Sequence, residues 1–181
     1  MHFPSRLFRK TSSLSLMLAM GFLAVSVYPE ASQASGGCDG LNLFSGVERN
    51  QQLSCRLDFG GTPNGTDRYR FRLDKKKMKY AVSEFTIDYS DHFTGSFDTK
   101  NVEIIVNGKN VKVQEVIWEE ENHFLKVIPV DPIAAGTAVE IHFSNVRNPR
   151  NNGMYYFNCR VQTPGDVPLL RDLGTWIVEI S

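Results

Sequence analysis

The sequence predicts an all-β protein: an antiparallel, immunoglobulin-like β-sandwich that forms a single domain after an N-terminal signal peptide. Three observations support this prediction. Apolar residues recur with a period of two from Leu53 onward, β-branched and aromatic residues dominate these runs, and turn-forming residues separate them at fairly regular intervals. No stretch has the periodicity of a convincing amphipathic helix. A partly open barrel is the alternative architecture.

The composition fits one ordinary globular domain. Of the 181 residues, 41% are hydrophobic and 22% are charged, with 20 basic and 20 acidic side chains. This balance argues against intrinsic disorder and gives no electrostatic reason to expect a nucleic-acid partner.

The first 34 residues have the pattern of a secretory signal peptide. Basic residues precede an apolar run over 14–27, which is shorter than the roughly 20 residues that a transmembrane helix needs. Ser32 and Ala34 place small side chains where a signal peptidase requires them, so we expect cleavage after Ala34. The mature chain would begin at Ser35, carry a formal net charge of −2 and have no transmembrane span. We expect it in the periplasm or outside the cell.

The first expected strands each have one buried face. Apolar and polar residues alternate over 53–59, up to and including Phe59, and the Gly-rich segment 60–65 ends that strand. The alternation resumes over 69–73, where arginines occupy the polar positions, and again over 81–89. Each run therefore predicts a strand of a sheet that packs on one side only.

A tight hairpin is expected in the middle of the chain. The strand over 102–106 leads into Asn107-Gly108, a dipeptide that strongly favours a two-residue hairpin turn, and the chain returns over 111–113. A segment through 116–118 follows.

The acidic turn 119–122 precedes the next strand, which is expected over 124–130. Further alternating runs predict strands over 139–143, 155–161 and 176–180. Trp118 and Trp176 fall within expected strands, so we expect both in the core.

An ordered set of loop and strand residues marks the C-terminal half. Its members are Phe93-Thr94-Gly95, Gly136-Thr137, Asn148-Pro149, Gly153, Tyr155-Tyr156-Phe157, Pro164-Gly165, Pro168 and Leu173-Gly174-Thr175-Trp176. In the order and spacing of these residues, the chain over about residues 67–181 resembles a family of exported cyanobacterial proteins known as the domain of unknown function 2808. The resemblance implies a cyanobacterial source, export and a β-sandwich. It implies no activity.

Four residues of this set, Asn148, Pro149, Gly153 and Gly174, are interpreted as a structural loop motif. Asn148-Pro149 starts a turn that excludes helix, and Gly153 supplies conformational freedom before the chain re-enters the core. The alternative is that the polar loop 147–152 presents its side chains to a glycan or peptide.

The most distinctive surface feature is cationic. An arginine row (Arg68, Arg70, Arg72) is followed by a lysine segment (Lys75, Lys76, Lys77, Lys79). One interpretation is a solvated strand face whose charges discourage edge-to-edge pairing, opposite the acidic residues 119–121. The other is contact with an anionic partner, such as an acidic envelope polysaccharide or lipid headgroups.

Three cysteines are present, and export would allow two of them to pair. Cys38 lies in the Gly-rich leader expected over 35–46, where a cysteine has little packing use, so we predict that it ties this leader to Cys55. A bridge between Cys55 and Cys159 is the alternative, since both fall on the apolar side of their expected strands.

No pattern predicts catalysis, a cofactor or a metal. His92, His123 and His142 are the only imidazoles after residue 34, none lies in a nucleophile motif, and His142 is expected on a solvent-facing strand position. A calcium site from Asp88, Asp91 and Asp98 is a minor alternative.

These observations favour an exported, non-enzymatic cell-envelope protein, a binding or interaction module for an envelope protein or polysaccharide. A structural or assembly factor in the periplasm or thylakoid lumen is the first alternative. A hydrolase or metal-dependent enzyme, with a site assembled from scattered residues, is the second.

Overall fold

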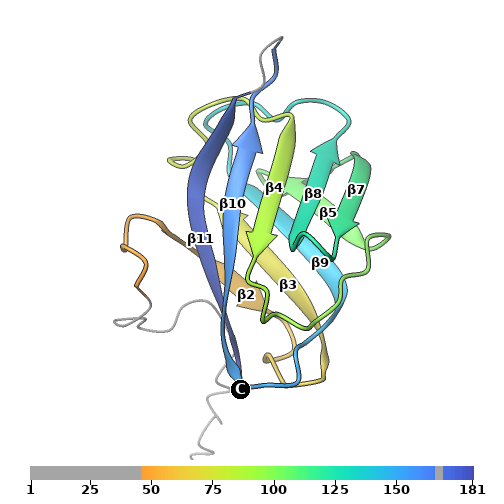
Figure 1. Ribbon diagram of the computed structural model, residues 1–181. Coiled ribbons are helices and arrows are strands. Elements are labelled where there is room, and N and C mark those ends of the chain that lie inside the picture. The colour runs from red at the N-terminus through yellow and green to blue at the C-terminus, as the bar shows by residue number, and fades with distance from the viewer. Residues whose placement is uncertain (1–45, 166–168) are drawn as a thin grey trace, which may run out of the picture. The chain divides into compact units, whose positions relative to one another are not determined.

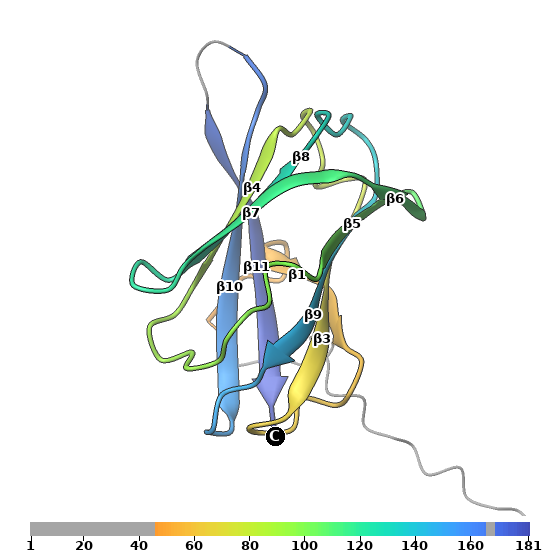
Figure 2. The same ribbon diagram turned by 90° about the vertical axis from the view of Figure 1, so that its right-hand side faces the viewer.

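Two β-sheets pack face to face in the computed structural model, which describes residues 46–165 and 169–181 (Figures 1 and 2). The predicted antiparallel, immunoglobulin-like β-sandwich is confirmed, and the described residues all belong to one compact unit. The expected signal peptide, 1–34, and the leader, 35–46, lie outside the described residues except for Gly46. No helix in the described part of the chain is long and apolar enough to cross a bilayer.

The larger sheet has six strands in the order β1-β11-β10-β4-β8-β7, and the other has five in the order β2-β3-β9-β5-β6. The six-stranded sheet comprises β1 (Gln52–Leu53), β4 (Glu84–Tyr89), β7 (Val113–Glu119), β8 (Phe124–Pro129), β10 (Gly153–Gln162) and β11 (Leu170–Ile180). The five-stranded sheet comprises β2 (Cys55–Leu57), β3 (Thr66–Leu73), β5 (Val102–Val106), β6 (Lys109–Val111) and β9 (Val139–Arg147). Neighbouring strands are antiparallel, except that β1 runs parallel to β11.

The chain changes sheets at two single residues where the sequence predicts no break between sheets. Ser54 separates β1 from β2, and Lys112 separates β6 from β7. Leu53 and Cys55 both remain buried across the first change, because both sheets bury the face that points between them. The alternation of apolar residues therefore continues through the switch, and the pattern alone cannot show it.

The expected burial of Phe59 is wrong, since this side chain is 64% exposed. The strand ends at Leu57, and the following turn is held by Asp67, whose Oδ1 accepts a hydrogen bond from the Phe59 backbone N–H at 2.9 Å. Because Phe59 lies in this turn, it does not follow the alternation that buries Cys55 and Leu57.

The predicted hairpin at Asn107-Gly108 is confirmed. Val106 pairs with Lys109, so these two residues form the whole loop. Both have positive φ, 49° for Asn107 and 80° for Gly108, as a two-residue turn that matches the twist of its strands requires.

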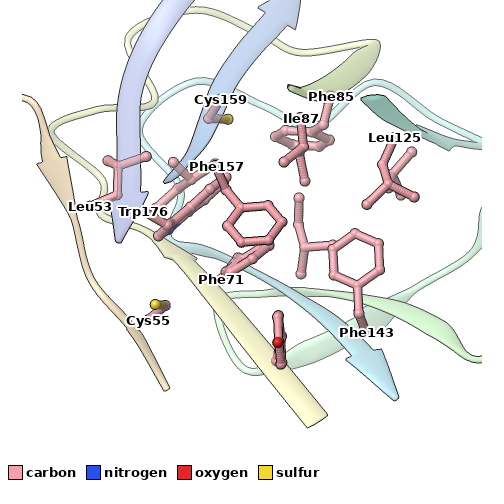
Figure 3. Packing of buried hydrophobic residues seen from close by; sticks show 14 of the residues in the cluster. Leu53, Cys55, Phe71, Phe85, Ile87, Leu125, Phe143, Phe157, Cys159 and Trp176 are labelled. Atoms are coloured by element: carbon pink, nitrogen blue, oxygen red, sulfur yellow. The ribbon is translucent and has the colours of Figure 1, made fainter. Parts of the chain in front are cut away.

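The space between the sheets is filled by aromatic and aliphatic side chains (Figure 3). Trp176 stacks on Phe71 with ring centroids 4.5 Å apart, and its indole N–H donates to the Arg72 carbonyl oxygen at 3.0 Å. Trp118 is half-buried against this cluster and donates to the Tyr89 hydroxyl at 2.8 Å. Both tryptophans therefore serve the core, as expected.

Candidate functional site

The arginine row lies on the outer face of the five-stranded sheet, where carboxylates neutralise it. Arg70 binds Asp58 through two nitrogens, Nε at 2.8 Å from Oδ1 and Nη2 at 2.7 Å from Oδ2. Arg68 Nη1 lies 3.7 Å from the same carboxylate, and Arg72 Nε lies 3.4 Å from Glu140 Oε1. The expected pairing with residues 119–121 is wrong, because Glu119 ends β7, in the other sheet.

His142 belongs to the same outer face but is not solvent-exposed, which corrects the sequence prediction. It lies between Arg70 on β3 and Glu103 on β5, and it is only 9% exposed because these long side chains and Glu140 cover it. Its Nε2 lies 2.9 Å from Glu140 Oε2, and its Nδ1 lies 3.9 Å from Glu103 Oε2. The outer face is thus an internally paired charge network.

The lysine segment follows β3, and its members have different environments. Lys77 Nζ donates to the Asn50 carbonyl oxygen at 2.6 Å and to the Leu173 carbonyl oxygen at 2.9 Å, so it fastens the start of β1 to β11. Lys75, Lys76 and Lys79 are exposed. The sequence could not separate these roles, because both carbonyl acceptors come from distant parts of the chain.

Three segments that are distant in sequence enclose a groove of about 760 Å³ at this position. They are residues 50–51, a segment after β3 that contributes Lys76, Lys77, Lys79 and Tyr80, and Leu170–Leu173 of β11. We call this the β11 groove. The sequence predicts its lysines as a surface feature but not the β11 wall, because the expected strand begins only at Trp176. Asp172 and Gly174 interrupt the alternation there.

Arg171 adds a further cation to the β11 groove, and its guanidinium lies against the ring of Tyr80. The guanidinium carbon of Arg171 lies 4.0 Å from the centre of the Tyr80 ring, within the range of a cation–π contact. Its Nε is buried and has no hydrogen-bond partner among the described residues. No sequence signal relates these positions, because only the fold brings them together.

Cations outnumber carboxylates in the groove. Lys76, Lys79 and Arg171 form no ion pair with any described residue. The single carboxylate in the walls is Asp172, whose Oδ1 accepts the Gly174 backbone N–H at 2.7 Å. The arrangement can therefore attract an anionic group, with a tyrosine ring beside the charge.

Asn148 and Pro149 fasten the end of β9 to the loop that precedes β3. The buried Asn148 side chain accepts a hydrogen bond from the Tyr69 hydroxyl at 2.7 Å and donates to the Thr62 carbonyl oxygen at 2.9 Å. The Pro149 carbonyl oxygen accepts the Asn64 N–H at 3.0 Å. Through these contacts, both residues stabilise the fold.

The two glycines of the motif differ. Gly174 has a φ of 128°, and a Cβ placed there would lie 2.2 Å from the Gln51 carbonyl oxygen, so only glycine fits between β11 and the start of β1. Gly153 begins β10 without a positive φ, and a Cβ there would make an ordinary contact of 3.8 Å with Tyr155. The conformational freedom expected of Gly153 is not used in this structure.

Cys159 is a free, fully buried thiol, and burial raises the pKa of its thiol far above the ordinary value. The alternative bridge between Cys55 and Cys159 is therefore wrong, and Figure 3 shows the two sulfur atoms well apart in the core. Cys38 lies outside the described residues. Its pairing with Cys55 stays a prediction.

The three aspartates considered for calcium bind separate partners. Arg160 Nε donates to Asp88 at 2.7 Å, and Asp91 lies 3.3 Å from the His92 ring. Asp98 accepts hydrogen bonds from two asparagine amides, and these bonds hold the pKa of its carboxyl below the usual value. Residues 46–165 and 169–181 contain no cluster of three or more potential metal ligands. Asp88, Asp91 and Asp98 therefore do not form the calcium site considered as an alternative.

Solved structures that match this chain include a bacterial hydrophobin, an adhesin domain and a pilin fragment. The bacterial hydrophobin BslA has a TM-score of 0.45 and 12% identity, over 72% of this chain and 97% of that one. The collagen-binding domain of a Staphylococcus aureus adhesin has a TM-score of 0.38 and 11% identity, over 65% and 88%. A 35 kDa C-terminal fragment of the Streptococcus agalactiae major pilin GBS80 has a TM-score of 0.44 and 9% identity, over 71% and 55%.

A search of curated proteins finds no match. The sequence model of one family, described as a protein of unknown function (DUF2808), matches residues 42–180. This range starts earlier than the expected 67 and takes in β1 and β2. The chain belongs to the DUF2808 family.

Proposed function

We propose that this protein is an exported, non-enzymatic binding module of the cell envelope, and that its β11 groove binds an anionic partner. The observation that carries the proposal is the contrast between the two cationic regions. Carboxylates occupy the arginine row, whereas Lys76, Lys79 and Arg171 have no carboxylate partner among the described residues. Export is proposed from the signal-peptide pattern of residues 1–34.

The chemistry of the groove suits carboxylate, sulfate or phosphate groups. A guanidinium can bind such a group through two parallel N–H donors, and the tyrosine ring under Arg171 restricts the orientation of that guanidinium. Lys76 and Lys79 are exposed and add charge without a fixed geometry. A partner with repeated negative charges would use all three.

The test is binding to two anionic probes, polygalacturonate and poly-L-glutamate, measured over a range of NaCl concentrations. The groove variant carries Lys76→Gln, Lys79→Gln and Arg171→Gln. Its matched control carries Lys100→Gln, Lys109→Gln and Arg150→Gln, which removes the same charge from exposed positions outside the groove. We expect the groove variant to bind at least one probe about tenfold more weakly or worse, and the control to lose less than about threefold.

The salt dependence should also become shallower in the groove variant, because fewer ion contacts are screened. Equal losses in both variants would show that only net charge matters, and the proposal would fail. The proposal would also be overturned if the wild-type protein bound neither polygalacturonate nor poly-L-glutamate. A loss confined to variants of Arg68, Arg70 and Arg72 would move the site to the outer face of the five-stranded sheet.

A further inference from the structure

One wall of the β11 groove is an open strand edge. β1 pairs with β11 only at Thr175 and Trp176. Residues 170–172 pair with β10 on one side, and no described strand pairs with them on the other. The free edge therefore lies beyond the start of β1, on the side of Gln52.

The register shows which backbone groups point into the groove. The Gln162 carbonyl oxygen accepts the Ser83 N–H at 2.9 Å, so the backbone groups of Gln162 face β4. Successive residues of a strand point their N–H and C=O groups to opposite sides, so those of Val161 face β11 and meet Arg171. It follows that the N–H and C=O groups of Leu170 and Asp172 point away from β10, into the groove.

The two ends of this edge differ. Toward β1, Lys77 occupies the Leu173 carbonyl oxygen, and a bulge shifts the pairing of β11 with β10 between Cys159 and Arg160. Toward the hairpin, Leu170 is 56% exposed, and across the groove Tyr80 is 45% exposed. An extended segment entering from the hairpin side would therefore meet a fixed stop at Lys77.

We propose that the partner of the β11 groove is an extended acidic polypeptide, which adds as a strand to β11 at Leu170 and Asp172. The inference rests on the proposed function, because it names the class of the anionic partner. Two backbone donor–acceptor sets, about 6.8 Å apart along an edge, match the spacing of alternate residues in another strand. The three unpaired cations select acidic side chains on that strand.

A peptide probe tests the backbone contacts directly. The probe is a blocked heptapeptide of alternating glutamate and valine, with two analogues that are N-methylated at alternate residues, one in each phase. Methylation removes N–H donors along one edge without changing the charge. We expect the parent peptide to bind and one phase of methylation to weaken binding about tenfold or more, as expected for lost backbone hydrogen bonds.

A variant of the protein tests the same contacts from the other side. Leu170→Pro removes an N–H that faces the groove and no N–H that pairs with β10, and proline is tolerated at such an edge position. Leu170→Ala is the matched control, since it shortens the side chain and keeps the N–H. We expect Leu170→Pro to weaken peptide binding about tenfold and Leu170→Ala less than about threefold. The thermal unfolding of each variant is measured alongside.

The outcomes separate this inference from the proposed function. If polygalacturonate and the peptide both bind, but neither methylation phase weakens the peptide, the anionic site stands and strand addition is overturned. If the groove variant and its matched control bind polygalacturonate and the peptide with the same affinities as each other, the proposed function itself fails. If Leu170→Pro does not fold, the methylated peptides decide the question with the wild-type protein.

Discussion

Asp58 shows how one carboxylate can organise a charged surface at the residue scale. Three guanidinium groups surround it: Arg70 at 2.7 Å, and Arg56 and Arg68 each at 3.7 Å. Its side chain is only 12% exposed, while those of the arginines are 31–58% exposed. The arginines lie side by side because β2 and β3 pair there, so without Asp58 they would repel one another.

Replacing this carboxylate should destabilise the sandwich modestly. We expect Asp58→Asn to lower the free energy of unfolding by about 1 kcal/mol, since the ion pairs are partly exposed and solvent screens them. Urea denaturation measures the change. Asp131→Asn, at an exposed position, is the control and should shift the midpoint little. Equal stability of the two variants would show that the arginine cluster needs no central carboxylate.

At the scale of the element, β11 combines structural and functional requirements. Its C-terminal part is almost wholly buried and carries Trp176, whereas its first residues form the wall of the groove. Gly174 lies at the boundary, where the Gln51 carbonyl oxygen, just before β1, comes closest. The bulge at this point ends the pairing with β1 and leaves the edge beyond it open.

Two glycine substitutions separate backbone strain from steric conflict. Gly108 has a positive φ but no described atom within 4 Å of a Cβ, so Gly108→Ala should cost about 1 kcal/mol through backbone strain alone. In Gly174→Ala the Cβ would meet the Gln51 carbonyl oxygen at 2.2 Å, so β1 must move. We expect a loss of about 3 kcal/mol, as for other severe local conflicts. Thermal and urea unfolding of both variants provide the comparison, and similar losses would show that the close approach of Gln51 to Gly174 adds no cost beyond backbone strain.

For the whole molecule, the fold sorts the cations into two environments. Side chains on the outer face of the five-stranded sheet neutralise one another, while Lys76, Lys79 and Arg171 converge at an edge of the other sheet. The net charge of the chain does not indicate this difference between the two environments. Binding therefore depends on local charge, and a salt dependence is expected despite a formal net charge of zero for the full chain and −2 for the chain after residue 34.

Export and cysteine pairing can be tested together on the mature protein. We expect an N-terminus at Ser35, because Ser32 and Ala34 suit a signal peptidase. Non-reducing peptide mapping should join Cys38 to Cys55 and recover Cys159 unmodified by iodoacetamide under native conditions, since burial raises the pKa of its thiol. Detection of Met1, a lipidated Cys38 or a linked Cys159 peptide would contradict this prediction.

The sequence by itself determined the fold class, the Asn107-Gly108 hairpin and the burial of Trp176, because alternation and turn chemistry are local and strands of either sheet obey them equally. Only the tertiary structure decided that Ser54 and Lys112 change sheets, that Asp58 neutralises the arginine row and that Arg171 joins the lysines. These outcomes depend on which strands become neighbours. A sequence pattern specifies which face of a strand is buried, but the pairing of distant strands is set by packing of the whole sandwich.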